Sequence, residues 1–115
     1  MSAAQSQGLL VVMIDIEPEF EDEFNRWYEE EHLPEREQCA GFLTARRYVA
    51  VDGQPKYLAI YELEDVGILE SDAYREIGIP SRWMKSLRPH FTTMVRNVYR
   101  ALPRDPDAVP KRGVR

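Results

Sequence analysis

The sequence predicts one α+β domain with the element order β-α-β-β-α-β, in which a four-stranded antiparallel sheet carries two helices on one face. Three observations support this fold class. Four stretches rich in Val, Ile, Leu and Tyr have the composition of strands. Two stretches with apolar residues three and four positions apart have the pattern of helices. The length of 115 residues suffices for one hydrophobic core.

The first half of the chain carries the strongest signals. Residues 8–17 form a continuous apolar run, which predicts a buried strand. A helix is predicted next, beginning near Pro18, which a first helical turn tolerates, and ending near Gly41, a suitable C-terminal cap. One face of this helix carries Phe20, Phe24, Trp27, Tyr28 and His32. We expect this aromatic face to pack on the sheet, while Glu29 and Glu30 turn to solvent.

The second half completes the fold. Residues 42–51 and 56–64 predict two strands joined by an Asp-Gly-Gln-Pro turn, a typical hairpin signal. Residues 65–78 predict a second helix that starts from an Asp N-cap. Residues 80–90 predict a short extra helix or an ordered loop, and residues 91–102 predict the last strand.

The domain is expected to cover residues 8–102, between a flexible N-terminus of residues 1–7 and a mobile tail of residues 103–115, which is rich in Pro and charge. The net charge of −5, without a basic stripe, argues against a nucleic-acid partner. A membrane span needs about 20 consecutive apolar residues, and no apolar run approaches this length. The first residues lack a signal-peptide pattern. Cys39 is the single cysteine, which excludes an intrachain disulfide and agrees with a cytoplasmic protein. No Cys/His grouping has zinc-site spacing, so no metal is predicted.

The first predicted strand is apolar on both faces, which bears on the oligomeric state. Side chains alternate along a strand. One face therefore carries Leu10, Val12, Ile14 and Ile16, and the other carries Leu9, Val11 and Met13. Two helices cover only one face, and the uncovered face would be a larger apolar patch than soluble monomers usually expose. We expect the same sheet of a second copy to cover it, which predicts a homodimer.

Several motifs resemble a known family. Trp27, Tyr28, His32 and Pro34 form a W-Y-x-x-x-H-x-P run, and the segments GFLTARRY, KYLAIYEL and RPHF follow it. Over about residues 8–102 the chain resembles the dimeric α+β barrel proteins of ferredoxin-like fold, especially the EthD-like group. The resemblance implies a homodimeric α+β barrel. Members of this superfamily include muconolactone-type isomerases, polyketide cyclases, cofactor-free monooxygenases and haem-degrading enzymes, so the resemblance does not fix a reaction. The chain lacks the histidine set of the cyclases, and Cys39 stands where such sequences tend to have proline or a small residue.

His32 is the leading candidate for a catalytic residue. Pro34 cannot donate a hydrogen bond to the carbonyl of Glu30, so the helix is expected to kink or end there. His32 would then lie near unpaired carbonyls, the negative end of the helix dipole and Glu31. These neighbours predict a raised pKa and a His32 that donates a proton near neutrality, inside a cavity roofed by the second subunit. The alternative is a histidine that only caps the helix end.

The other candidates each have a structural alternative. Tyr28 is predicted to act beside His32 as a hydrogen-bond donor, or else to be a core ring. Trp27 either contacts substrate or packs. Of the adjacent Arg46 and Arg47, one faces the covered side of the sheet, where Arg47 is favoured as the anchor of a substrate anion.

Three further aromatic residues and a second histidine complete the predicted site. Tyr57 and Tyr61 share one face of a strand and can line a pocket with their hydroxyls. Trp83 is expected to close a lid or to hold its loop in place. His90 is a second candidate for acid–base catalysis, with a structural role as the alternative.

Three functions follow from these assignments. The first is a cofactor-independent isomerase, cyclase or lyase that acts on a small carbonyl, lactone or aromatic compound, with catalytic His32, Tyr28 and His90. Its substrate would contact Trp27, Arg47, Tyr57, Tyr61 and Trp83. The second is a cofactor-free or haem-dependent monooxygenase, in which either histidine would ligate the haem iron. The third is a ligand-binding dimer without catalysis.

Overall fold

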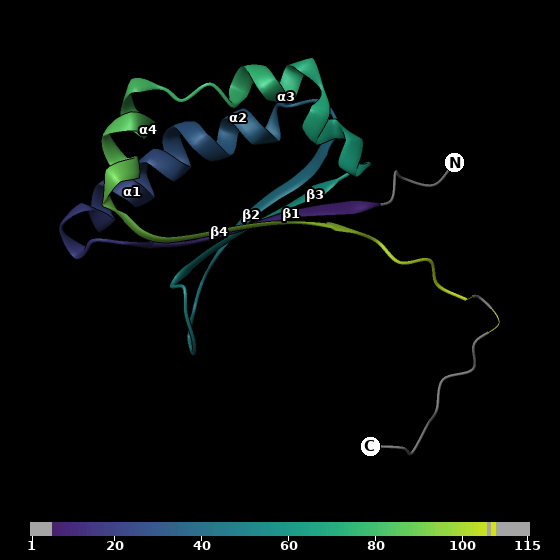
Figure 1. Cartoon of the computed structure of the whole chain (residues 1–115), viewed down its shortest axis with the longest axis horizontal. Helices are drawn as coiled ribbons and strands as arrows, with labels where there is room; N and C mark the ends of the chain where they lie inside the picture. The colour runs from purple at the N-terminus through teal and green to yellow at the C-terminus, as the bar shows by residue number, and fades with distance from the viewer. Residues whose placement is uncertain (1–5, 106, 108–115) are drawn as a thin grey trace.

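The computed structural model describes residues 6–105 and 107 (Figure 1). The strands β1 (Gly8–Ile16), β2 (Phe42–Val49), β3 (Tyr57–Leu63) and β4 (Phe91–Arg100) form one sheet in the order β2-β3-β1-β4. All three strand pairs are antiparallel. The predicted four-stranded α+β ferredoxin-like fold is therefore confirmed. Most of the predicted flexible N-terminus and mobile tail lies outside the described residues.

The first helical segment runs on past Pro34. It comprises η1 (Pro18–Phe20), α1 (Glu21–Trp27), the π-helical turn η2 (Tyr28–His32) and α2 (Leu33–Glu37). In the π turn the N–H of Leu33 donates to the carbonyl of Tyr28, five residues earlier. This widened turn accommodates the proline, which has no N–H to donate. Of the two outcomes expected at Pro34, a kink or an end of the helix, the end does not occur, and the regular α-helix is instead interrupted by the π turn.

Gly41 was also expected to cap this helix, but the helix ends at Glu37, four residues earlier. Gly41 has a φ of +92°, and a Cβ at this position would lie 2.3 Å from Cδ1 of Ile68. Glycine is thus required by backbone conformation and by a close approach between the start of β2 and the helical layer.

The helical segments between β3 and β4 are shorter than predicted. The expected helix over 65–78 is divided into η3 (Val66–Glu70) and α3 (Asp72–Ile77), because Ser71 is extended and caps α3 through its hydroxyl. The short extra helix is present as α4 (Arg82–Leu87) followed by η4 (Arg88–His90). All helices lie on the same side of the sheet (Figure 1). Within the described residues, no helix is both long enough and apolar enough to span a membrane.

The two faces of the sheet differ as the alternation predicts. Leu10, Val12, Ile14 and Ile16 are buried beneath the helices, together with Phe24 and Trp27 of α1. The opposite face, here called the open face, carries Leu9, Val11 and Met13 of β1 and, by strand register, Leu58 and Ile60 of β3 and Val95 of β4. No described helix covers the open face (Figure 1).

Candidate functional site

A cavity of about 160 Å³ lies between the helices and the sheet. Its lining includes Leu10, Val12 and Ile14 of β1, Trp27 and Tyr28 at the end of the first helix, His32, Arg36, Tyr61, Tyr74, Met84, Arg88, Phe91, Met94 and Arg96. The cavity is on the helix-covered side of the sheet, away from the open face. The expectation of a cavity roofed by a second copy of the sheet is therefore not met, because the first helix points its aromatic face at its own sheet.

The buried imidazole of His32 lines this cavity. Its exposed fraction is 9%, and its ring lies 4.4 Å from the Trp27 ring and 5.0 Å from the Tyr28 ring, centroid to centroid. No hydrogen bond from residues 6–105 or 107 reaches either ring nitrogen. Aromatic packing holds the imidazole in place, and its ring nitrogens are available to hydrogen-bond a ligand.

The predicted raised pKa of His32 is wrong. Burial, with the positive charges of Arg36, Arg47 and Arg88, lowers the pKa of His32 to about 3. The helix continues through His32, so no helix end lies beside the imidazole to stabilise its charged form. His32 is therefore neutral at physiological pH and is not the imidazolium acid that the sequence analysis expects.

Glu31, which was expected to favour the charged imidazole, is engaged elsewhere. Its Oε2 accepts hydrogen bonds from Nε1 of Trp27 at 2.8 Å and from the hydroxyl of Ser81 at 2.5 Å. Ser81 also caps α4. Glu31 thus fixes α4 against the first helix. Because the indole N–H of Trp27 is bonded to Glu31, Trp27 lines the cavity with the apolar surface of its ring.

Two buried phenols line the cavity beside His32. Burial raises the pKa of Tyr28, and burial and the neighbouring Tyr28 raise the pKa of Tyr61 well above its ordinary value. Both therefore stay protonated. The Tyr61 side chain is only 1% exposed, and its hydroxyl interacts with the Tyr28 side chain but has no partner among the described residues with the geometry of a full hydrogen bond. A buried hydroxyl without a partner is costly, which indicates that a ligand completes it.

Three arginines in the cavity lining were missed by the sequence analysis: Arg36, Arg88 and Arg96. Arg36 lies four residues after His32 on the same helical face. The assumption that Pro34 ends the helix concealed this relation. Arg96 shares the helix-facing side of β4 with Met94, as strand alternation allows.

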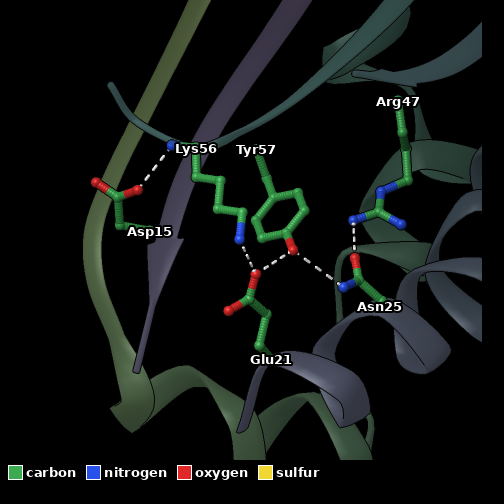
Figure 2. A network of polar contacts seen from close by, with 6 residues as sticks. All are labelled: Asp15, Glu21, Asn25, Arg47, Lys56 and Tyr57. Atoms are coloured by element: carbon green, nitrogen blue, oxygen red, sulfur yellow. Dashed lines mark hydrogen bonds and ion pairs between the residues drawn. The ribbon is translucent and has the colours of Figure 1, made fainter. Parts of the chain in front are cut away.

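Arg47 faces the helices, as favoured, but lies outside the cavity. Its guanidinium is 4.4 Å from the Tyr28 ring centroid, and its Nη2 donates to Oδ1 of Asn25 at 2.6 Å. Figure 2 shows that Tyr57 belongs to the same polar network. The Tyr57 hydroxyl donates to Glu21 and accepts from Nδ2 of Asn25 at 3.2 Å. Arg46 lies on the open face and is exposed.

His90 and Trp83 do not line the cavity. His90 stacks on Phe20 at 3.5 Å between centroids, and its Nδ1 lies 3.4 Å from Oε1 of Glu17 without hydrogen-bond geometry. Trp83 packs at the edge of the core, with the Arg26 guanidinium 5.7 Å from its ring centroid. The structure thus brings together Trp27, Tyr28, His32 and Tyr61 and leaves these two aside. No three His, Cys, Asp or Glu side chains of the described residues are placed to hold a metal ion.

Comparison with known proteins identifies a fold class. No protein-family model matches the chain, and no curated protein matches it. A dimeric ferredoxin-like protein from an uncultured marine organism has a TM-score of 0.68 and 16% identity, over 89% of this chain and 93% of the other. An antibiotic biosynthesis monooxygenase has a TM-score of 0.63 and 17% identity, over 84% and 99%. The haem-degrading protein MhuD of Mycobacterium tuberculosis, with two haems bound, has a TM-score of 0.61 and 13% identity, over 85% and 98%.

At such identities the comparisons establish the fold and leave the reaction open. The chain has an α+β ferredoxin-like fold that is shared with dimeric proteins and with a monooxygenase and a haem degrader. The narrower resemblance to the EthD-like group stays a prediction.

Proposed function

We propose that the protein is a cofactor-independent enzyme in which neutral His32 removes a proton from a small carbonyl, lactone or aromatic compound bound in the cavity. One observation carries the proposal: the His32 imidazole is buried and uncharged, faces the cavity, and has no hydrogen-bond partner among the described residues. A neutral imidazole with an unpaired nitrogen can act as a general base, and the proposal requires that a bound anion offset the charges of Arg36, Arg47 and Arg88 that hold its pKa down, because a base works best with a pKa near the operating pH. The acid role expected from the sequence is thus replaced by a base role.

The two phenols complete the reaction. Removing a proton beside a carbonyl leaves negative charge on the oxygen, and the hydroxyls of Tyr28 and Tyr61 are protonated donors suited to stabilise it. Isomerisation, cyclisation and non-hydrolytic cleavage all can begin with this step. Arg47 and Tyr57 act indirectly in this scheme, since Arg47 packs on the Tyr28 ring and both residues are hydrogen-bonded to Asn25.

A cofactor-free monooxygenase is the second candidate, supported by the fold shared with an antibiotic biosynthesis monooxygenase. The same proton abstraction would give an electron-rich anion able to react with O₂. Oxygen consumption during turnover distinguishes the two candidates. An isomerase, cyclase or lyase converts its substrate equally well under anaerobic conditions.

Haem does not fit the cavity as it stands. The cavity volume is about 160 Å³, whereas pockets for drug-sized ligands occupy about 300–1,000 Å³, and a haem macrocycle is at least drug-sized. A haem-dependent step is therefore not part of the proposal. Haem mixed with the protein is expected to keep the visible absorption spectrum of free haem.

Replacing His32 tests the proposed role directly. On any carbonyl, lactone or phenol that the protein converts, His32→Gln is expected to lower kcat/KM by about 10²–10⁴-fold, the usual contribution of a general base. His90→Gln is the control and should leave the rate unchanged, because His90 lies outside the cavity. Equal rates for His32→Gln and the unmodified protein would refute the proposal. Ligand binding without any turnover would favour the ligand-binding dimer.

The homodimer is part of the same proposal. The open face exposes an apolar surface formed by Leu9, Val11, Met13, Leu58, Ile60 and Val95, and a dimeric protein shares the fold. Sedimentation equilibrium should give twice the mass of the chain. Val11→Lys should yield monomers, whereas Val51→Lys, in the exposed hairpin turn, should not. A monomeric unmodified protein would contradict this part of the proposal.

A further inference from the structure

We propose that the ligand of this cavity is an organic anion, namely a small ring compound bearing a carboxylate or an enolate that Arg36 binds. This inference rests on the proposed function and adds the chemical class of the substrate. Arg88 and Arg96 supply further positive charge at the exposed rim of the cavity.

Arg36 is the main argument, because its charge is buried and poorly compensated. The residue is 7% exposed, its guanidinium lies 5.9 Å from the Tyr74 ring centroid, and no hydrogen bond joins the guanidinium to another described residue. Its ion pair is with Glu35 at 3.6 Å, a neighbour in sequence that is itself partly exposed. A buried charge is costly unless it is paired and hydrogen-bonded. The guanidinium faces the cavity, so a bound carboxylate would supply the missing acceptors in its preferred two-pronged geometry.

The charge of the whole cavity agrees with this assignment. Three arginines line it and no acidic residue does, although the chain has a net charge of −5. Arg96 donates to the hydroxyl of Tyr74 at 3.3 Å, a neutral acceptor, and Arg88 contacts the Met84 sulfur at 4.0 Å. Neither contact neutralises a charge. A positive cavity in a negative protein selects anions.

The remaining lining indicates a ring rather than a bare ion. Trp27, Tyr28 and Phe91 present aromatic surface, and the volume of about 160 Å³ limits the ligand to a small molecule. The hydroxyl of Tyr61 is buried in the same lining without a partner among the described residues. It would donate to a second oxygen of the ligand.

Paired probes of equal shape and different charge test the inference. Benzoate, salicylate and acetate are titrated into the full-length protein by calorimetry, each beside its uncharged amide. Benzoate or salicylate should bind at least about ten-fold more tightly than its amide, since hydrogen bonds to a charged partner are the stronger class. Equal affinity of each acid and its amide, or no binding by any of the three acids, overturns the inference.

Variants then assign the binding to Arg36. Arg36→Gln should weaken benzoate at least about ten-fold, whereas Arg82→Gln, an exposed arginine of α4 outside the cavity lining, should not. Circular dichroism shows whether Arg36→Gln is folded. If it is not folded, Arg36→Lys is used instead. This variant keeps the charge but loses the bidentate geometry, and it is expected to weaken benzoate binding by a smaller factor. An unchanged affinity in both Arg36 variants overturns the inference.

His32 provides a readout that reports binding inside the cavity. The charges that act on its imidazole are those of Arg36, Arg47 and Arg88, the Tyr28 ring packs against it, and Tyr61 lines the same cavity. A bound carboxylate offsets the positive charge, so NMR titration of the His32 ring above about pH 5, where benzoate is ionised, should show protonation beginning at a higher pH with benzoate than with benzamide. Benzoate bound at an arginine outside this group, such as Arg82, would leave the His32 pKa unchanged, and that result also overturns the inference.

Failure of this inference is separable from failure of the proposed function. If neutral compounds are turned over through His32 while carboxylates do not bind, only the substrate class is wrong. If carboxylates bind through Arg36 but His32→Gln retains full activity, the catalytic role is wrong and the anion site stands.

Discussion

Two neighbouring regions of the molecule contain the same kinds of side chain but treat them differently. In the network of Figure 2, Arg47 is bonded to Asn25, and Tyr57 and Lys56 are both bonded to Glu21. In the cavity, Arg36 has an ion pair at 3.6 Å, and the hydroxyl of Tyr61 has no partner among the described residues. The Tyr28 ring contacts both regions, because the Arg47 guanidinium lies 4.4 Å from its centroid and the His32 ring lies 5.0 Å from it.

The difference distinguishes polar groups that support the fold from polar groups that await a ligand. A paired network stabilises the folded chain and needs nothing further. Buried groups without partners reduce stability, and they persist where a ligand supplies the missing contacts. Three experiments test this contrast, in order of decreasing expected effect.

The largest effect is expected from the pH dependence of stability. Because the pKa of His32 is lowered to about 3 from its ordinary 6.5, the unfolded chain binds a proton below pH 6.5 that the folded chain does not accept until about pH 3. Stability therefore falls as the pH falls through this window. At pH 4.5, His32 should cost about 2–3 kcal/mol of unfolding free energy relative to pH 7.5. Urea unfolding at one fixed protein concentration measures it.

The control for this prediction is a pair of variants. His32→Gln should lose about 2–3 kcal/mol less on acidification than the unmodified protein, because glutamine does not titrate. His90→Gln leaves His32 in place and should keep the additional loss. If the two variants respond alike, the imidazole of His32 is not buried as described.

The second test compares the two arginines. Arg47→Met should lower the free energy of unfolding by about 1–3 kcal/mol, because it removes the hydrogen bond to Asn25 and the stacking on Tyr28. Arg36→Met should leave stability within about 1 kcal/mol or raise it, because a buried and poorly paired charge is exchanged for an apolar side chain. Urea unfolding at pH 7.5 in a buffer free of carboxylates measures both. Equal losses would mean that the fold itself satisfies Arg36.

The fold was accessible from the sequence because it depends on alternation and periodicity. The two-sided apolar pattern of residues 8–17 and the aromatic spacing from Phe20 to His32 place the sheet and the first helix correctly. The grouping of Trp27, Tyr28 and His32 follows from the same spacing. Short-range rules were sufficient there, since neighbours on one helical face stay neighbours in the structure.

The electrostatics of the site were not accessible, because they depend on one local event and on residues distant in sequence. The π turn before Pro34 carries the helix through the proline, which removes the expected dipole end and brings Arg36 to the cavity. Arg88 comes from another element, more than fifty residues away along the chain. Local rules therefore predicted the opposite direction for the pKa of His32.

The smallest effect is expected from the two tyrosines, which isolate single hydroxyls. Tyr57→Phe should lower the unfolding free energy by about 1–2 kcal/mol, since it removes the hydrogen bonds to Glu21 and Asn25. Tyr61→Phe should be neutral or stabilising by up to about 1 kcal/mol, because it removes a buried hydroxyl that has no partner among the described residues. Thermal and urea unfolding of the ligand-free proteins measure the difference. With benzoate present, Tyr61→Phe should be less stable than the unmodified protein, because the Tyr61 hydroxyl then has an acceptor. If, without ligand, Tyr61→Phe lowers the unfolding free energy as much as Tyr57→Phe does, the contrast between the two regions is removed.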